Sequence, residues 1–367
     1  MDKTKIEWCD STFNPWIGCT KISPACDNCY AERERATKAL DVEWGPGKSR
    51  HRTSDANWKK PERWNGIQFW QCVGCGWRGG DDERRDSPFV LCPVCACEEW
   101  LKPARRRVFC ASLADVFDNE VPWQWRLALF GLIRDTPNLD WLLLTKRIGN
   151  VKPMLDEIQV HGPIGDVFPN IWLGATICNQ EEADRDILKL LAVPANIRFL
   201  SIEPLLGEMR IDDIAGPNGV GIIKPLAGIW WKPIENKLGL HWSWHQKIDW
   251  VIVGGESGSG ARPMHPDWVR SLRNQCMAAG VPFLFKQWGQ WVDAKQCEGL
   301  WADQLYTSDG GYRYTASLVA HDGSIHGDCR IAPDGCVTVR SVGKKVAARW
   351  LDGREWSQFP NRADKVE

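Results

Sequence analysis

Three cysteines lie close together near the start of the chain, in the stretch GCTKISPACDNCYAE at residues 18–32. Cys19, Cys26 and Cys29 are spaced C-x6-C-x2-C, with no fourth cysteine beside them. A structural zinc site uses four ligands, so three thiolates indicate a site that is open on one side. A cubic iron–sulfur cluster held by three thiolates also leaves one iron free for an outside ligand. The polar residues between these cysteines predict an exposed loop.

A second group of cysteines has the spacing of a zinc ribbon. Cys72-x2-Cys75 is followed, after sixteen residues, by Cys92-x2-Cys95. Two such pairs, each on a tight turn, can close one tetrahedral zinc ion. Cys97 lies close enough in sequence to take the place of Cys95. Because all four positions are filled, we expect this zinc to be structural and to hold an insertion that is too small to build its own core.

Composition limits the classes of protein that are compatible with the chain. The 367 residues are 43% apolar and carry a net charge of −1, which allows a sizeable core and gives no overall basic field. Fifteen cysteines with no secretory apolar segment favour metal ligands in a reducing compartment over disulfides. No apolar run is long enough to cross a bilayer. We therefore expect a cytoplasmic protein with no membrane partner.

The elements that must position these cysteines follow the ribbon. Short apolar runs end in polar residues and alternate with helical patterns, which predicts parallel strands covered by helices. Together with one further strand near the N-terminus, these strands and helices predict a full or partial (β/α) barrel. The residues just past each strand would line the mouth of this barrel. The six predicted strand regions are 107–118, 140–147, 170–177, 197–207, 249–258 and 281–289.

The predicted fold is α/β and has four segments. Residues 1–66 form an N-terminal segment that carries the three-cysteine loop and starts the barrel. Residues 67–101 form the inserted zinc ribbon, and residues 102–290 form the main barrel with a hairpin insertion at 216–239. Residues 291–367 form an irregular C-terminal capping segment, in which His321, His326, Cys329 and Cys336 are either a further metal site or part of an irregular hairpin.

The loop at residues 18–32 resembles the cluster loop of radical S-adenosylmethionine (SAM) enzymes, in particular the branch around spore photoproduct lyase. The glycine before the first cysteine and the Tyr30-Ala31 pair after the third match that loop, whereas the first spacing is six residues instead of three. ASLADVFDNE and LLTKR resemble later segments of the same branch. The whole chain is similar to a phage- and mobile-element-associated family with a three-cysteine motif, through IEW-x-DSTFNPWIGC, VGGESG-x3-RP, FKQWG and GKK-x5-LDGREW.

The resemblance implies a [4Fe-4S] cluster on Cys19, Cys26 and Cys29, with SAM bound to the free iron. One electron then cleaves a C–S bond of SAM and yields a 5′-deoxyadenosyl radical. Such enzymes bind the SAM ammonium with Gly-Gly-Glu after the second strand; here Ser112 and Asp115 stand in that region. The remaining SAM-binding residues predicted are Lys146 or Arg147 for the carboxylate, Glu203 for the ribose, and Glu256 beside the adenine or substrate. Each carboxylate has a helix cap or a surface ion pair as its alternative role.

Two functions follow from these patterns. The first is a radical SAM-type enzyme that modifies or repairs a nucleic-acid base, with a peptide or a small molecule as the alternative substrate. Its expected partners are an electron donor, a nucleic acid and a protein encoded nearby. The second is a non-catalytic zinc-binding adaptor for nucleic acid or protein, in which Cys9 or Cys110 completes a second zinc site. Cations and tryptophans that flank the ribbon suit a nucleic-acid surface, with docking of a partner protein as the alternative. They are Lys59, Lys60, Arg63, Trp64, Trp70, Trp77, Arg78, Lys102, Arg105, Arg106 and Arg107.

Overall fold

The structure is a computed structural model that describes residues 3–83, 91–97, 100–233, 240–295, 316–326 and 335–361. The chain divides into two compact units. The first comprises Met1–Thr20, Ala31–Gly174 and Val193–Asn196, and the second comprises Lys21–Tyr30, Ala175–Ala192 and Ile197–Glu367. The division between the units therefore falls within the three-cysteine loop, after Thr20. The four segments predicted from the sequence stay a prediction.

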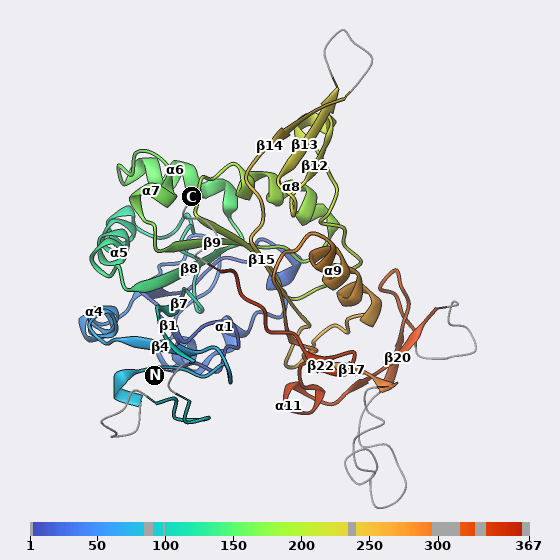
Figure 1. Ribbon diagram of the computed structural model, residues 1–367, viewed down its shortest axis with the longest axis horizontal. Coiled ribbons are helices and arrows are strands. Elements are labelled where there is room, and N and C mark those ends of the chain that lie inside the picture. Colours follow the sequence, from blue (N-terminus) through green and yellow to red (C-terminus); the bar gives the residue numbers. More distant parts are fainter. Residues whose placement is uncertain are drawn as a thin grey trace, which may run out of the picture. The chain divides into compact units, whose positions relative to one another are not determined.

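A seven-stranded sheet runs in the order β1-β7-β8-β9-β10-β15-β16 (Figure 1). The pairs β1·β7, β7·β8, β10·β15 and β15·β16 are parallel. The order begins at β1 and ends at β16 without closing in the described part of the chain, so the partial form of the barrel is the one observed. The strands are β1 (Ser11–Thr12), β7 (Arg106–Cys110), β8 (Leu139–Thr145), β9 (Ile171–Thr176), β10 (Ile197–Ile202), β15 (Trp250–Gly254) and β16 (Phe283–Gln287).

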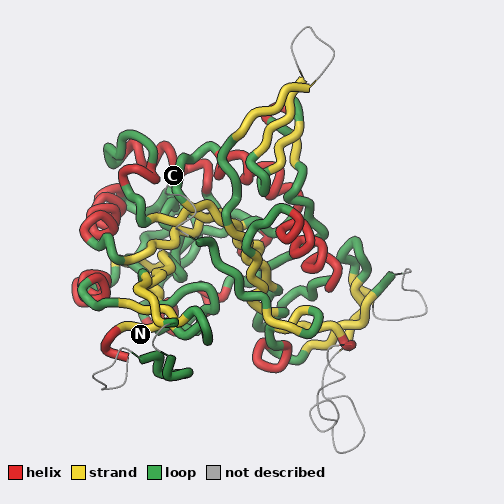
Figure 2. Tube along the Cα trace, in the orientation of Figure 1, coloured by secondary structure: helices red, strands yellow, loops and turns green. Residues whose placement is uncertain are grey.

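The strands of this sheet are buried along almost their whole length. Parallel strands covered on both faces read as continuous apolar runs, which is why the sequence showed them. Helices follow β7, β8, β9 and β15 along the chain, and Figure 2 draws them in red. Asn179 caps one of them by accepting a hydrogen bond from the amide of Glu182 at 2.9 Å. The helices are α5 (Trp123–Asp135), α6 (Val151–Glu157), α7 (Ile164–Val167), α8 (Gln180–Leu191) and α9 (Pro266–Ala278).

The first unit also holds the ribbon region and short elements around it. Strands β4, β5 and β6 form an antiparallel sheet in the order β5-β4-β6. The strands are β2 (Trp16–Ile17), β3 (His51–Arg52), β4 (Phe69–Cys72), β5 (Arg78–Gly80) and β6 (Leu101–Ala104). The helices are α1 (Tyr30–Arg33), α2 (Arg35–Ala39), α3 (Asp55–Trp58) and α4 (Lys60–Asn65), with 3-10 turns η2 (Asp81–Glu83) and η3 (Ile148–Asn150).

The described residues of the second unit also form two four-stranded antiparallel sheets and one two-stranded antiparallel sheet near the C-terminus. The region predicted as a hairpin insertion is a four-stranded sheet of β11 (Ile214–Ala215), β12 (Ile222–Lys224), β13 (Ile229–Pro233) and β14 (Leu240–Trp244), with the turn η4 (Pro217–Gly219). The C-terminal segment, predicted to be irregular, contains a second sheet in the order β17-β20-β18-β19. The described elements of this segment are β17 (Trp291–Asp293), β18 (Ala316–Val319), β19 (Ile325–His326), β20 (Val337–Ser341), α11 (Lys344–Ala347), β21 (Trp350–Leu351) and β22 (Arg354–Glu355). The last two strands pair with each other as a separate sheet. Cys329 of the alternative metal site lies outside the described residues.

Tryptophans fill much of the core of each unit. In the first unit Phe13 packs edge-on against Trp58 and Trp141, with ring centroids 5.7 and 5.6 Å apart. In the second unit Trp250 packs against Phe199 at 5.8 Å. Edge-to-face pairs of this kind add about 1 kcal/mol each to the free energy of burial.

Candidate functional site

Cys19 lies at the carboxyl-terminal edge of the sheet in the first unit. Gly18 forms a parallel bridge with Ala114, and its amide donates to the carbonyl of Leu113 at 3.1 Å. Leu113 and Ala114 follow β7, so the bridge sets Cys19 beside the end of that strand. Gly18 has φ +111°, a backbone conformation that favours glycine. The carboxyl ends of parallel strands are where open α/β folds bind ligands.

Arg147, just past β8, connects Cys19 to two buried carboxylates. Its Nη1 donates to the Sγ of Cys19 at 3.5 Å and to Asp115 at 3.2 Å. Its Nη2 lies 3.7 Å from the carboxylate of Asp118 and donates to the carbonyl of Thr20 at 2.7 Å. The side chains of Arg147, Asp115 and Asp118 are 6%, 7% and 2% exposed. The guanidinium therefore lies in a buried, strongly polar environment directly on the cysteine sulfur.

Arg50 extends this network to the loop backbone. Its side chain is fully buried, with Nε donating to Asp118 and Nη2 donating to the hydroxyl of Thr20, each at 2.8 Å. Asp115 in turn accepts hydrogen bonds from the Thr145 hydroxyl at 2.7 Å and from the amides of Phe117 and Lys146 at 2.9 and 3.0 Å. Both carboxylates are thus engaged by protein donors, and together they fix the first half of the three-cysteine loop.

The surroundings of Cys19 determine its ionisation. Burial raises the pKa of the Cys19 thiol to about 12, and the negative charge of Asp115 adds to this effect while Arg147 opposes it. The sulfur is therefore protonated at neutral pH unless a cation binds it. Metal ligation has this effect, because a metal ion displaces the proton of a coordinating thiol.

Cys26 and Cys29 belong to the second unit. The 3-10 turn η1 (Pro24–Cys26) begins at Ser23, whose Oγ accepts a hydrogen bond from the amide of Ala25 at 3.1 Å. The amide of Cys29 then donates to the carbonyl of Cys26 at 3.2 Å. Cys26 is buried and Cys29 is half-buried. The two cysteines of the C-x2-C pair therefore lie on one tight turn.

Arg262 holds the Cys26–Cys29 segment in the second unit. Its Nη1 donates to the carboxylate of Asp27 at 2.9 Å, and its Nη2 donates to the carbonyl of Pro24 at 2.8 Å. Its Nε donates to Glu256 at 3.0 Å. Asn28 adds hydrogen bonds to Glu256 at 3.1 Å and to the carbonyl of Gly260 at 2.8 Å. The residues after β15 therefore form a clamp on the second half of the loop.

Glu256, which the resemblance placed near the SAM adenine or the substrate, is a central acceptor of this clamp. Burial raises the pKa of Glu256, but the hydrogen bonds that Arg262 donates outweigh it and hold this pKa below its ordinary value. The carboxylate is accordingly ionised at neutral pH and committed to Arg262. Binding of SAM by Glu256 stays a prediction.

The other predicted SAM-binding residues have separate surroundings. Ser112 and Asn14 exchange hydrogen bonds at 3.0 and 3.3 Å. Lys146 is half-buried next to Asp115. In the second unit, Glu203 accepts a hydrogen bond from Ser201 at 3.1 Å and lies 3.0 Å from the ammonium of Lys286. Their roles toward SAM stay predictions.

Sequence reasoning missed Arg50 and Arg262 as site residues. Arg50 stands in KSRHR, a basic run that is usually a solvated face. Arg262 had a signal, because the segment VGGESG-x3-RP contains both members of the Glu256–Arg262 pair. Long-range partners such as Arg50 and Asp118 carry no local signature.

The second cysteine group converges on one point. The Sγ atoms of Cys72, Cys75, Cys92 and Cys95 all lie within 4.8 Å of one another. A hydrogen bond from the amide of Cys75 lowers the pKa of Cys72 to about 7, so a thiolate is accessible at neutral pH. Cys72 and Cys92 are buried against Leu101, while Cys75 and Cys95 are exposed. The four thiols can bind a metal ion such as zinc, and the fourth position belongs to Cys95 rather than Cys97.

Many of the cations that flank the ribbon are neutralised within the protein. Arg78 forms a two-point ion pair with Asp10 at 2.9 Å, and Asp10 also accepts from the amide of Arg107 at 2.7 Å. Arg106 is 2% exposed and its guanidinium lies 4.9 Å from the centre of the Phe69 ring. Burial lowers the pKa of Arg107 to about 9. These arginines anchor β5 and β7 and offer little charge to an external phosphate backbone.

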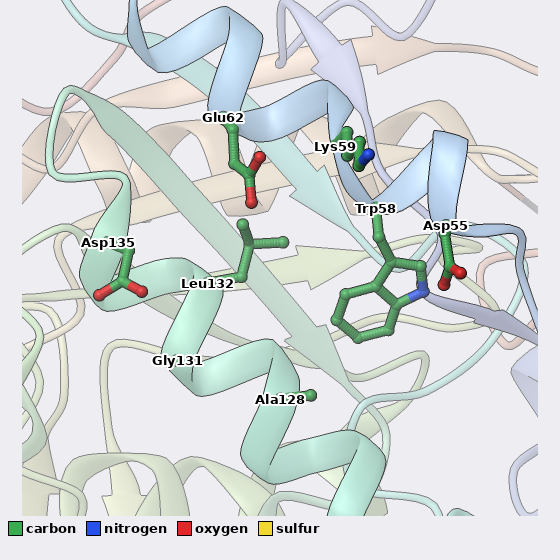
Figure 3. Close-up of a pocket in the computed structure, with 8 residues that line it drawn as sticks. All are labelled: Asp55, Trp58, Lys59, Glu62, Ala128, Gly131, Leu132 and Asp135. Atoms are coloured by element: carbon green, nitrogen blue, oxygen red, sulfur yellow. The ribbon is translucent and has the colours of Figure 1, made fainter.

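A surface pocket of about 480 Å³ lies between α3, α4 and α5 in the first unit. Figure 3 shows the residues that line it. Three of its side chains are acidic and one, Lys59, is basic. A surplus of negative charge around Lys59 disfavours a polyanion at this surface. The lining residues are Asp55, Trp58, Lys59, Glu62, Ala128, Gly131, Leu132 and Asp135.

Comparison with known families assigns the chain as a whole. A family model described as "Protein of unknown function (DUF5131)" matches residues 3–360. The chain belongs to this family. Both cysteine groups and the residues that contact Cys19 fall inside the match. Searches of curated proteins and of solved structures find no match. In the described parts of the chain, every helix is too short or too polar to cross a bilayer.

Proposed function

We propose that this protein is a radical SAM-type enzyme whose iron–sulfur cluster is held by Cys19, Cys26 and Cys29. The observation that carries the proposal is the position of Cys19, a half-buried thiol at the carboxyl-terminal edge of a parallel sheet with the guanidinium of Arg147 on its sulfur. Hydrogen bonds to sulfur ligands are a principal means by which proteins tune iron–sulfur clusters.

The residue types of the three-cysteine loop support this proposal. Three thiols without a fourth ligand suit a cluster with one open iron, and thiolates are the ligands that iron–sulfur clusters prefer. Each half of the loop is held by hydrogen bonds within its own unit. In the first unit, Arg147 and Arg50 donate to Thr20. In the second unit, Arg262 donates to Pro24 and Asp27. Ligands fixed in this way bind without a large loss of conformational entropy.

Bound to these thiols, a [4Fe-4S] cluster would supply the electron that splits a C–S bond of SAM. In this proposal Arg147 and Asp115 position Cys19, and Arg262 and Glu256 position the segment of Cys26 and Cys29. Ser112, Lys146 and Glu203 are the predicted residues left to contact SAM. A nucleic-acid base is the proposed substrate, in keeping with the branch that the loop resembles, and an external donor supplies the electron.

The test is anaerobic reconstitution of the full-length protein with iron and sulfide. We expect visible absorption from the cluster and, with dithionite and SAM, formation of 5′-deoxyadenosine. Cys26→Ala should abolish both signals. Cys276→Ala is the matched control, because Cys276 is a buried cysteine of α9 far from the loop in sequence, and it should leave both signals intact. A protein that takes up zinc but no iron under these conditions would exclude the proposal.

The four converging thiols of Cys72, Cys75, Cys92 and Cys95 favour zinc at the ribbon under either function. A non-catalytic adaptor is the second candidate function. A zinc site in which all four ligand positions are cysteines stabilises the fold and does not require a catalytic site elsewhere in the chain. Metal analysis separates the two. If the protein is the enzyme, it should contain iron, which Cys26→Ala loses, and zinc, which Cys72→Ala loses. If it is the adaptor, it should contain no iron.

A further inference from the structure

Asp115 uses both of its carboxylate oxygens within the protein. Oδ1 accepts hydrogen bonds from the Thr145 hydroxyl at 2.7 Å and from the amide of Phe117 at 2.9 Å. Oδ2 accepts from the amide of Lys146 at 3.0 Å and from Nη1 of Arg147 at 3.2 Å. A carboxylate offers about four acceptor sites, so these donors leave little capacity for the ammonium of a ligand. The resemblance placed Asp115 at that ammonium, and its contacts favour a different role.

The different role follows from the guanidinium that Asp115 holds. Nη1 of Arg147 donates to Asp115 and, at 3.5 Å, to the sulfur of Cys19. The side chains of Arg147 and Asp115 are 6% and 7% exposed, so water screens their charges only weakly. A cation thus contacts the sulfur of Cys19 directly, and an anion pairs with the same nitrogen of that cation.

These two charges have opposite effects on a reducible group bound to the sulfur. The reduction potential of an iron–sulfur cluster depends on the charges around it and on hydrogen bonds to its sulfur ligands. Reduction adds one negative charge, which the guanidinium of Arg147 stabilises and the carboxylate of Asp115 destabilises. Removal of the arginine charge should therefore lower the potential, and removal of the aspartate charge should raise it. A merely structural ion pair gives no reason for such opposite shifts.

We propose that Arg147 and Asp115 are positioning residues that set the reduction potential of a cluster on Cys19, with Arg147 raising the potential and Asp115 lowering it. The inference rests on the proposed iron–sulfur function and adds the residues that tune its electron transfer. The contacts that carry it all lie within the first unit. Asp118 contributes less, because it faces the other nitrogen, Nη2, at 3.7 Å and is also paired with Arg50 at 2.8 Å.

The experiment is a redox titration of the full-length protein after anaerobic reconstitution with iron and sulfide. The electron paramagnetic resonance signal of the reduced cluster reports the midpoint potential. We expect Arg147→Met to lower this potential by about 59 mV or more, which is a tenfold change in the equilibrium constant of a one-electron couple. Asp115→Asn should raise it by a similar amount. Arg147→Lys keeps the charge and should lie closer to the unmodified protein than Arg147→Met does.

An exposed ion pair of the same unit provides matched controls. Arg134 and Asp135 on α5 pair at 3.1 Å, with side chains that are 70% and 66% exposed. Arg134→Met and Asp135→Asn should leave the midpoint potential unchanged, because water screens both charges. Circular dichroism and iron content show whether each variant is folded and loaded with the cluster.

Failure of this inference is distinguishable from failure of the proposed function. If the unmodified protein takes up no iron, the proposed function is wrong and the inference falls with it. If the unmodified protein holds the cluster, but Arg147→Met and Asp115→Asn shift the potential in the same direction or no more than the controls, only the inference is overturned. If Arg147→Met does not retain iron, the sign of the shift in Asp115→Asn decides.

Discussion

Arg147 donates a hydrogen bond to the sulfur of Cys19 at 3.5 Å. The same guanidinium faces Asp115 and Asp118, both nearly inaccessible to solvent. One cation thus compensates two buried carboxylates and reaches the first thiol of the three-cysteine loop. Because the desolvation of all three charges depends on their mutual contacts, the stability of this region and the position of Cys19 are coupled.

Removal of this guanidinium should be costly. We expect Arg147→Met to lower the free energy of unfolding by about 3 kcal/mol, because it leaves buried carboxylates with one cation fewer. Urea unfolding measures the change. Arg134→Met is the matched control, since Arg134 pairs with Asp135 at 3.1 Å while their side chains are 70% and 66% exposed, and it should cost less than about 1 kcal/mol. Equal losses in the two variants would show that the buried network is not coupled.

The ribbon offers a test of ligand assignment within one short segment. Cys95 converges with Cys72, Cys75 and Cys92, whereas Cys97 contributes its backbone carbonyl to the amide of Cys92 at 3.3 Å. We expect Cys95→Ser to reduce the bound zinc and the thermal stability of the ribbon, because a lost thiolate removes much of the binding energy that folds it. Cys97→Ser should retain zinc at the level of the unmodified protein. Metal analysis after gel filtration distinguishes them, and zinc loss from Cys97→Ser alone would reverse the assignment.

Patterns with a local cause were readable from the sequence. The strand region predicted at 249–258 contains β15 (Trp250–Gly254), because a strand buried on both faces must be continuously apolar. The spacing of Cys72, Cys75, Cys92 and Cys95 predicted their convergence, because two tight turns of that kind impose it.

Features set by long-range packing were not readable. Lys102 and Arg106 belong to one basic run, yet Lys102 is exposed and Arg106 is buried against Phe69. Which of the two is available to a ligand depends on the pairing of β6 and β7 with other strands, and composition does not encode that pairing. Arg50 and Asp118 meet across 68 positions of sequence, and nothing around either residue indicates the other.

The clamp at Glu256 predicts a pH dependence of stability. The pKa of Glu256 is lowered in the folded protein, so its contribution is fully present above the ordinary carboxyl pKa of about 4.3 and is lost as the pH falls through the lowered value. We expect Glu256→Gln to cost about 1–3 kcal/mol at neutral pH, because Arg262 loses its charged acceptor. The variant and the unmodified protein should converge only as the pH falls below this lowered pKa of Glu256.

Urea unfolding between about pH 7 and pH 2, which extends below the ordinary carboxyl pKa by about two units, measures this difference. Glu181→Gln on the exposed surface of α8 is the control, and its stability should follow that of the unmodified protein throughout. A constant difference between Glu256→Gln and the unmodified protein across the whole range would mean that the carboxylate charge plays no part in the clamp.

Three glycines should respond to alanine in a graded way, because their surroundings differ. Gly131 on α5 borders the open pocket of Figure 3, and an added Cβ would meet nothing within 4 Å. At Gly254 the Cβ would lie 2.7 Å from Oε1 of Glu203, the end of a side chain that can turn away. At Gly255 it would lie 1.9 Å from the carbonyl oxygen of Trp288, which belongs to the backbone and cannot yield without moving the chain.

We therefore expect Gly131→Ala to raise the free energy of unfolding by about 1 kcal/mol, as alanine is the better helix former. Gly255→Ala should lower it by about 3 kcal/mol or more, since overpacking against backbone is strongly destabilising. The change in unfolding free energy for Gly254→Ala should fall between these two values. Its main cause should be disturbance of the 3.0 Å ion pair between Glu203 and Lys286. In the background of Glu203→Gln, which removes the charge of that contact, Gly254→Ala should cost measurably less, and an unchanged cost there would place the strain elsewhere than at Glu203.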